Sequence, residues 1–154
     1  RHEAPRVLGT PTPRAEHAAR MLLAQMSLWE RLSEAEHAML CSQPAPVGPL
    51  LRWLDAQYQE QGAVAWGVLS ELLRVQSFAA FAQDLMARHQ ALSATQNLDE
   101  MGGELRSIML GIAHDAYAEQ ANRAARSNDL EGLRRANEAI KRIAAERASI
   151  RMSE

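Results

Sequence analysis

The sequence predicts an all-α protein, a compact N-terminal helix bundle followed by a long C-terminal helical hairpin. Val, Ile and Thr, which favour β-strands, together number only 13, whereas the helix-favouring Ala, Leu, Glu, Gln and Arg are abundant. No stretch alternates polar and apolar residues for long enough to indicate a half-buried strand. Large apolar residues instead recur at three- and four-residue spacing along most of the chain.

Residues 1–11 are expected to form a linker or tether, because Pro5, Gly9 and Pro11 interrupt a stretch with little periodicity. The bundle is expected over residues 12–96. Thr12 is a good N-cap, Pro13 fits the first helical position, and Glu16 completes a capping-box pattern. One face of this first helix carries Ala18, Met21, Leu22 and Met26.

Ser33 and Glu36 form a second capping-box pattern, which predicts a short helix through Leu40. The prolines and glycine of "CSQPAPVGP" then predict a break. The next helix is expected to end at Gly62 and carries an apolar face of Leu50, Leu51, Trp53, Leu54 and Tyr58.

A further helix is expected over residues 63–75 and a short one from Phe78. The apolar side of the former comprises Val68, Leu69, Leu72 and Leu73. The aromatic side chains expected in or near the core of the bundle are Trp29, Trp53, Trp66, Phe78 and Phe81.

The hairpin is expected over residues 97–154. Its first helix is predicted to run from Leu98 to Arg126, with apolar positions at Leu98, Met101, Leu105, Ile108, Met109, Ile112 and Ala116. Asn128 and Glu131 form a capping-box pattern that starts the second helix. Its inner seam is expected to hold Leu130, Leu133, Ala136 or Asn137, Ile140, Ile143 or Ala144, and Arg147.

This seam is narrow and partly alanine, and a two-helix hairpin alone is marginally stable. We therefore expect another protein to cover the hairpin. The candidate partner-binding residues lie on the second helix, although Leu133 and Ile140 have the alternative role of holding the hairpin together. The full candidate set is Leu133, Arg134, Asn137, Ile140 and Lys141.

No pattern in the sequence predicts a catalytic, metal or cofactor site. The five histidines are scattered; the two-histidine spacing of a helical zinc site does not occur, and the expected long helix from Leu98 carries no Glu-x-x-His motif. The glycines of "GVLSEL" and "MGGEL" follow no expected strand and so predict no phosphate loop. Cys41 has no basic neighbour and is interpreted as a small hydrophobic residue.

The overall charge of the chain does not favour nucleic-acid binding. With 17 Lys and Arg against 19 Asp and Glu, the net charge is −2, and acids interrupt the basic runs of the hairpin. We expect no strong direct nucleic-acid binding. The single cysteine excludes an internal disulfide and favours a reducing compartment. No apolar run approaches the ~20 residues that span a bilayer, so a cytoplasmic protein without a membrane partner is expected.

The order of these parts resembles the C-terminal helicase-binding domain of bacterial replicative primases of the DnaG type. The segments that carry the resemblance are "TPRAEHAARMLLAQ", "PLLRWLDAQYQEQG", "VLSELL" and "SNDLEGLRRANEAIKRIA". None is a strict motif. One departure is "QMSLWERL", where relatives commonly have a Pro-Glu-Leu turn. The chain begins "RHEAPRVLGT" without an initiator Met, which we interpret as a fragment of a longer protein or a start within a linker.

The resemblance implies a protein-interaction domain without primer-synthesis chemistry, in a parent protein that is a DNA primase. The hairpin would dock on N-terminal domains of a DnaB-type replicative helicase, recruit primase to the fork and modulate both activities. Zinc and magnesium would belong to N-terminal domains outside this fragment, which itself would hold no cofactor. Two rival interpretations are a generic helical adaptor or regulatory subunit, and the N-terminal domain of a replicative helicase, which has a similar fold.

Overall fold

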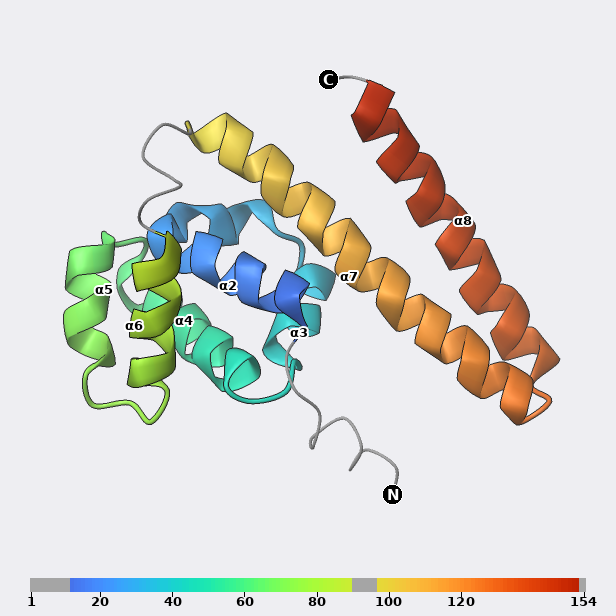
Figure 1. The fold of residues 1–154 in the computed structure, drawn as a ribbon, viewed down its shortest axis with the longest axis horizontal. Coiled ribbons are helices and arrows are strands. Elements are labelled where there is room, and N and C mark those ends of the chain that lie inside the picture. Colours follow the sequence, from blue (N-terminus) through green and yellow to red (C-terminus); the bar gives the residue numbers. More distant parts are fainter. Residues whose placement is uncertain (1–11, 90–96, 153–154) are drawn as a thin grey trace. The chain divides into compact units, whose positions relative to one another are not determined.

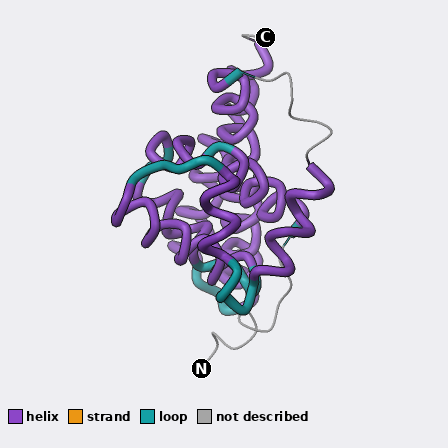
Figure 2. The backbone as a smooth tube through the Cα atoms, turned by 90° about the vertical axis from the view of Figure 1, so that its left-hand side faces the viewer, coloured by secondary structure: helices purple, strands orange, loops and turns teal. Residues whose placement is uncertain are grey.

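The computed structural model describes residues 12–89 and 97–152, and all secondary structure in these ranges is helical (Figure 1). Figure 2 shows these helices joined by loops and turns, with no strand in the described ranges. The all-α prediction is confirmed. The chain divides into two compact units, one ending at Leu105 and the other beginning at Arg106. The tether expected over residues 1–11 lies outside the described residues.

The first unit begins with α2 (Pro13–Ala24), which starts where the sequence predicts. The Thr12 hydroxyl oxygen accepts a hydrogen bond from the backbone N–H of Ala15 at 3.1 Å, and Pro13 occupies the first helical position. The buried face of α2 is wider than the predicted stripe, since it consists of Ala15, Ala18, Ala19, Met21, Leu22 and Leu23.

A 3₁₀ helix, η1 (Met26–Arg31), follows α2 and leads to α3 (Glu34–Cys41). Ser33 and Glu36 form the predicted capping box, and both of its hydrogen bonds are present. Met26 therefore belongs to η1 and not to the first helix, although it is buried as expected.

The break after α3 is shorter than the sequence suggested, because α4 (Val47–Gln61) already begins inside "CSQPAPVGP". Pro49 is tolerated there, since the first N–H groups of a helix need no intrahelical acceptor. Gly62 ends α4 with a φ of 76°, a left-handed conformation that favours glycine, as its predicted C-terminal position requires.

Helix α5 (Trp66–Leu73) is shorter than the expected span of 63–75, and only half of its predicted apolar side is buried. Leu69 and Leu73 are fully buried. The apolar residues that remain exposed on or just beyond α5 are Val68, Leu72 and Val75. The prediction failed here because α5 is apolar around most of its circumference, so composition alone could not indicate which side faces the core.

Helix α2 lies at the centre of this unit and contacts η1, α4, α5 and α6 (Ala79–His89), while α3 packs on α4. Trp29 is buried, its ring N–H donates to a carboxylate oxygen of Asp55 at 2.9 Å, and its ring stacks on His37. The other aromatic residues expected in or near the core, which are half-buried, are Trp53, Trp66, Phe78 and Phe81.

Helix α7 (Leu98–Arg126) has the predicted bounds, and Asn97 and Glu100 cap it reciprocally. Its first two turns belong to the first unit, in which Met101 and Leu105 are buried. The two units therefore meet inside α7, and not between residues 96 and 97 where composition changes.

A tight turn joins α7 to α8 (Leu130–Met152). Asn128 adopts a left-handed conformation with φ 59°, and the N–H of Asp129 donates to the carbonyl of Ala124, so α7 ends in a Schellman motif. Asp129 then caps α8 by accepting from the N–H of Gly132. The predicted cap was wrong by one residue, because Asn128 closes α7 and Asp129 opens α8.

Candidate functional site

The second unit consists of the rest of α7 and all of α8, and the buried positions of α8 are mainly small side chains. Ala136, Ala139 and Ile143 of α8 are buried, at positions that share one helical face. Ala124 is buried on α7, and Arg106 pairs with Glu146 farther from the turn. Farther from the turn, α7 also buries Met109, Leu110 and Ile112, so it is α8 that contributes little apolar area.

The seam agrees with the predicted one at Ala136 and Ile143, which are buried, but the prediction also placed Leu130, Leu133 and Ile140 inside. Leu130 has 76% of its surface exposed, Asn137 is exposed, and Leu133 and Ile140 are half-buried. At 100° per residue, Leu130 lies about 120° around the helix from Ala136, so both cannot face α7. Of the other expected seam positions, Ala144 is exposed, whereas Arg147 is half-buried and lies on the same side of α8 as Ala136.

The large apolar residues displaced from the seam form part of an outer surface. A shallow depression of about 370 Å³ on α8 is lined by Leu130, Leu133, Arg134, Asn137, Glu138 and Lys141. We call these six residues the outer face. It combines the well-exposed Leu130 and the half-buried Leu133 with charged and amide groups.

Four of the five candidate residues therefore lie together, namely Leu133, Arg134, Asn137 and Lys141. Ile140 does not line the depression and lies nearer the seam, half-buried. Leu130 and Glu138 were missed as candidates. Leu130 was assigned to the seam on hydrophobicity alone, whereas its position in the first turn of α8 is the signal that could have placed it outside.

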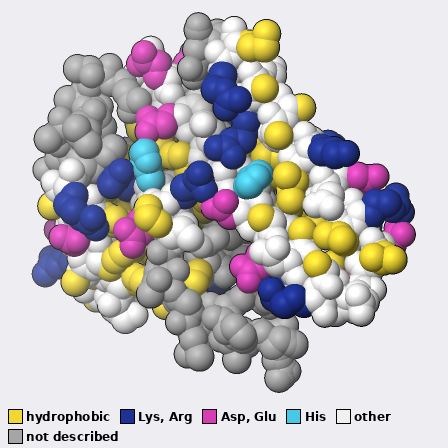
Figure 3. All heavy atoms as spheres, turned by 45° about the vertical axis from the view of Figure 1, so that its right-hand side comes forward, with side chains coloured by type: hydrophobic (Ala, Val, Ile, Leu, Met, Phe, Trp, Pro, Cys, Tyr) yellow, Lys and Arg dark blue, Asp and Glu magenta, His cyan; other side chains and the backbone are white. Residues whose placement is uncertain are grey.

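A second depression, a groove of about 620 Å³, lies between α7 and α8 on another side of the hairpin. Its lining includes the seam alanines Ala124, Ala136 and Ala139 and three arginines, Arg123, Arg135 and Arg142. Figure 3 shows hydrophobic side chains of the hairpin, toward the right of the view, bordered by basic and acidic side chains. Sequence reasoning missed this groove, because its residues come together only through the register of the two helices.

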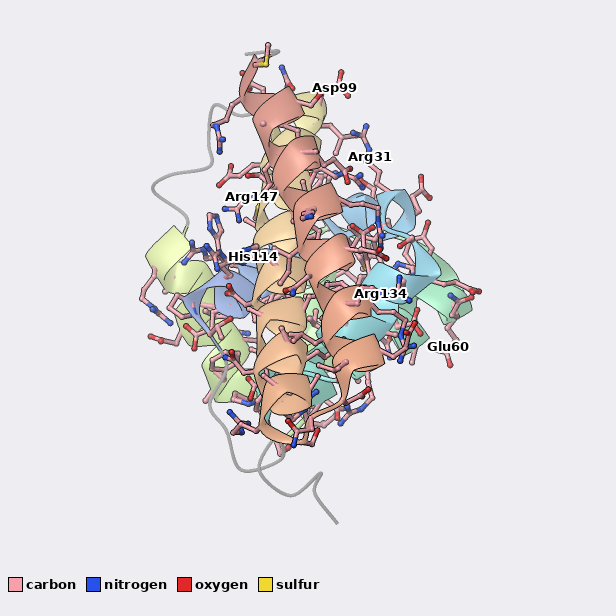
Figure 4. The ribbon with its side chains drawn as sticks, turned by 90° about the vertical axis from the view of Figure 1, so that its right-hand side faces the viewer. Arg31, Glu60, Asp99, His114, Arg134 and Arg147 are labelled. Atoms are coloured by element: carbon pink, nitrogen blue, oxygen red, sulfur yellow. The ribbon has the colours of Figure 1, made fainter. Side chains whose placement is uncertain are left out.

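Charges on α8 are only partly neutralised within the hairpin. Arg134 pairs with Glu131 and Glu138, and Arg135 lies 3.6 Å from Glu131. Within the described ranges, no acidic partner is found for Lys141 or Arg142. Figure 4 shows Arg134 and Arg147 on opposite edges of α8, so basic groups reach both sides of the helix.

The first unit contains a histidine with a perturbed pKa, His17. His17 contacts Glu104 at 2.9 Å, near the start of α7. Burial, and then the Arg20 cation, lower the pKa of His17, whereas Glu104 opposes this change. Arg31 and Asp99, labelled in Figure 4, form a second ion pair at the same end of α7, at 3.3 Å. Both pairs attach the first turns of α7 to the first unit.

Cys41 is half-buried, and its thiol is not activated. Burial, and then the Asp55 carboxylate, raise the pKa of Cys41, although Arg52 opposes them. A raised pKa disfavours the nucleophilic thiolate. In the described ranges no three His, Cys, Asp or Glu side chains come together as metal ligands, and no helix there is both long and apolar enough to cross a membrane.

Comparisons with protein-family models, with curated proteins and with solved structures give no match for the chain. The geometry of the hairpin is therefore the principal evidence for its role.

Proposed function

We propose that this chain is the helicase-binding domain of a bacterial replicative primase, and that the hairpin docks on N-terminal domains of the DnaB-type helicase. In this proposal the domain recruits primase to the fork and modulates helicase and primase activity. It carries no primer-synthesis chemistry of its own. The resemblance of the sequence to DnaG-type primases supports the proposed family, and the form of the hairpin supports its proposed role as the docking element.

The observation that carries the proposal is the mismatch between the length of α8 and the small apolar face that it buries. Helix α8 has 23 residues but buries only Ala136, Ala139 and Ile143. Most helical stability in proteins comes from packing an apolar face, so a helix of this length with so small a buried face is poorly supported by its own chain. A partner on the outer face would bury the exposed Leu130 beside Asn137 and Lys141.

The character of the outer face also supports a protein partner over a small substrate. The depression is shallow and its polar groups do not converge on an enclosed space. Small-molecule sites are usually concave, with 70% or more of the ligand surface buried. A specific protein interface instead needs a few central anchors surrounded by a polar rim, and Leu130 and Leu133 are suited to be anchors.

The test is a pull-down of the N-terminal domain of the replicative helicase from the same bacterium, with the wild-type chain and with N137A/K141A. Both residues are exposed, so their substitution should leave helix content unchanged while helicase capture falls. The matched control is S149A/R151A, which changes exposed polar groups near the far end of α8. Failure of the wild-type chain to capture helicase would contradict the proposal.

A further inference from the structure

Of the 17 lysines and arginines in the chain, Lys141 alone is a lysine. The two side chains differ in chemistry, because the arginine guanidinium stays charged, whereas a lysine amine can lose its proton, become a nucleophile and be acylated. Acylation of a side-chain amine can therefore occur at one position only. That position is on the outer face, where Lys141 is exposed and lines the depression together with Asn137.

The helix around Lys141 leaves its amine without a competing carboxylate. Within residues 12–89 and 97–152, no acidic side chain pairs with Lys141. Its neighbours one helical turn before or after are Asn137, Glu138, Ala144 and Ala145. The one acid among them, Glu138, lies 3.6 Å from Arg134 instead. Because a paired carboxylate stabilises the ammonium form, which cannot attack an acyl carbon, an unpaired amine is the more reactive one.

The second half of α8 also attracts anions. In residues 139–152 the one acid is Glu146, and it pairs with Arg106 of α7. The basic residues of the same span are Lys141, Arg142, Arg147 and Arg151. A surface on which one sign of charge predominates raises the local concentration of small molecules of the opposite charge. An acyl donor that carries a phosphate is therefore favoured over a neutral one.

We propose that Lys141 is an acylation site, modified by a small acyl phosphate, and that its acylation weakens docking of the partner on the outer face. The ammonium group first releases a proton to water. The amine nitrogen then attacks the acyl carbon, so that an N–C bond forms and the C–O bond to phosphate breaks. Inorganic phosphate leaves with the electron pair of that bond and takes up the second proton from the nitrogen.

The product differs from lysine in charge, because a neutral amide replaces the ammonium group. The other cation of the outer face, Arg134, is already paired with Glu131 and Glu138. Among the six residues of the outer face, acylation therefore removes the one cation that has no acidic partner. The effect on docking rests on the proposed function, whereas the modification site itself does not.

The site is tested by treating the whole chain with acetyl phosphate, with an unstructured peptide that has a single lysine between alanines as the reference. Digestion at arginine and mass spectrometry separate acetylation of Lys141 from that of the terminal amine. At low salt Lys141 should react at least as fast as the reference lysine. This advantage should shrink as salt is added, because salt screens the attraction of the anion. A lower rate than that of the reference, or a ratio of rates independent of salt, would overturn the assignment.

The consequence is tested by titrating the helicase N-terminal domain into the acetylated and the untreated chain. The matched control is K141R/R151K, which moves the single lysine to an exposed position of α8 outside the outer face. Acetylation should weaken helicase binding of the wild-type chain by roughly fivefold or more, and should leave the variant within about twofold of its own untreated form. Circular dichroism checks that acetylation and substitution preserve helix content. Equal effects of acetylation on the two chains would overturn the regulatory role.

The two experiments fail separately from the proposed function. Acetylation of Lys141 at the expected rate in a chain that never binds the helicase domain supports the site, but contradicts the helicase role and its regulation. Helicase binding by a chain whose Lys141 reacts more slowly than the reference supports the helicase role and contradicts the site.

Discussion

A substitution of Leu130 distinguishes a residue that binds a partner from one that stabilises the hairpin. With 76% of its surface exposed, it contributes little to the folded chain alone. Fully burying a leucine side chain stabilises by ~1.5–3 kcal/mol, so burying the exposed three-quarters against a partner contributes about 1–2 kcal/mol. Leu130→Ala should therefore weaken helicase binding by roughly 5- to 30-fold and leave the thermal midpoint of the free chain unchanged.

Ile143 is the matched control, because it is an aliphatic residue of the same helix with only 7% of its surface exposed. Ile143→Ala should lower the stability of the hairpin by about 2–5 kcal/mol, the cost of emptying a buried site. Calorimetry with the helicase N-terminal domain gives the affinities, and thermal denaturation followed by circular dichroism gives the stabilities. The reasoning is refuted if Leu130→Ala destabilises the free chain as much as Ile143→Ala does, or binds helicase as tightly as wild type.

Three further predictions concern the first unit. Because the pKa of His17 is lowered in the folded chain, the unfolded chain binds more protons below pH ~6.5, and the free energy of unfolding should fall as the pH drops below that value. The fall should be smaller in His17→Gln. An equal fall in the wild-type chain and in the variant would refute the assignment. A Cβ at Gly48 would lie 2.1 Å from the backbone oxygen of Gln43, so Gly48→Ala should lower the free energy of unfolding in urea by about 1–3 kcal/mol. At Gly67 nothing lies within 4 Å of the new Cβ, so Gly67→Ala should raise the same free energy by about 0.4–1 kcal/mol. The raised pKa of Cys41 should make the native thiol react with iodoacetamide more slowly at pH 7.5 than the same thiol in urea, and equal rates would contradict it.

The elements that the sequence predicted well are those with strong local signals. The start of α2 at Thr12, the capping box of Ser33 and the end of α4 at Gly62 each depend on a few neighbouring residues, and all three are confirmed. The bounds of α7 were predictable for the same reason, since a long uninterrupted periodic stretch needs no tertiary information.

The seam of the hairpin was not predictable in this way. Ala136 and Ile143 were expected in the seam and are buried, but hydrophobicity also favoured Leu130 and Ile140 as inner residues and gave no indication of Ala139. The choice depends on the rotation of α8 about its axis, which tertiary packing sets and hydrophobicity alone does not give. The composition of the outer face and of the groove follows from that rotation.

Aromatic burial was overestimated for a related reason. Trp53 and Phe78 contact edge to face, with ring centroids 6.1 Å apart, yet both remain half-buried at the side of the first unit. Trp29 is fully buried whereas these two residues are not, and sequence pattern gives no measure of how far each side chain reaches toward the core.

The most direct test of the central claim is calorimetric titration of the helicase N-terminal domain into the whole chain and into a chain truncated after Leu105. This truncation follows the division between the two units, so it keeps Met101 and Leu105 with the first unit and removes the rest of α7 and all of α8. We predict measurable binding to the whole chain and none to the truncated chain, whose circular dichroism should still report a folded bundle. Wild-type affinity in the truncated chain would contradict the account.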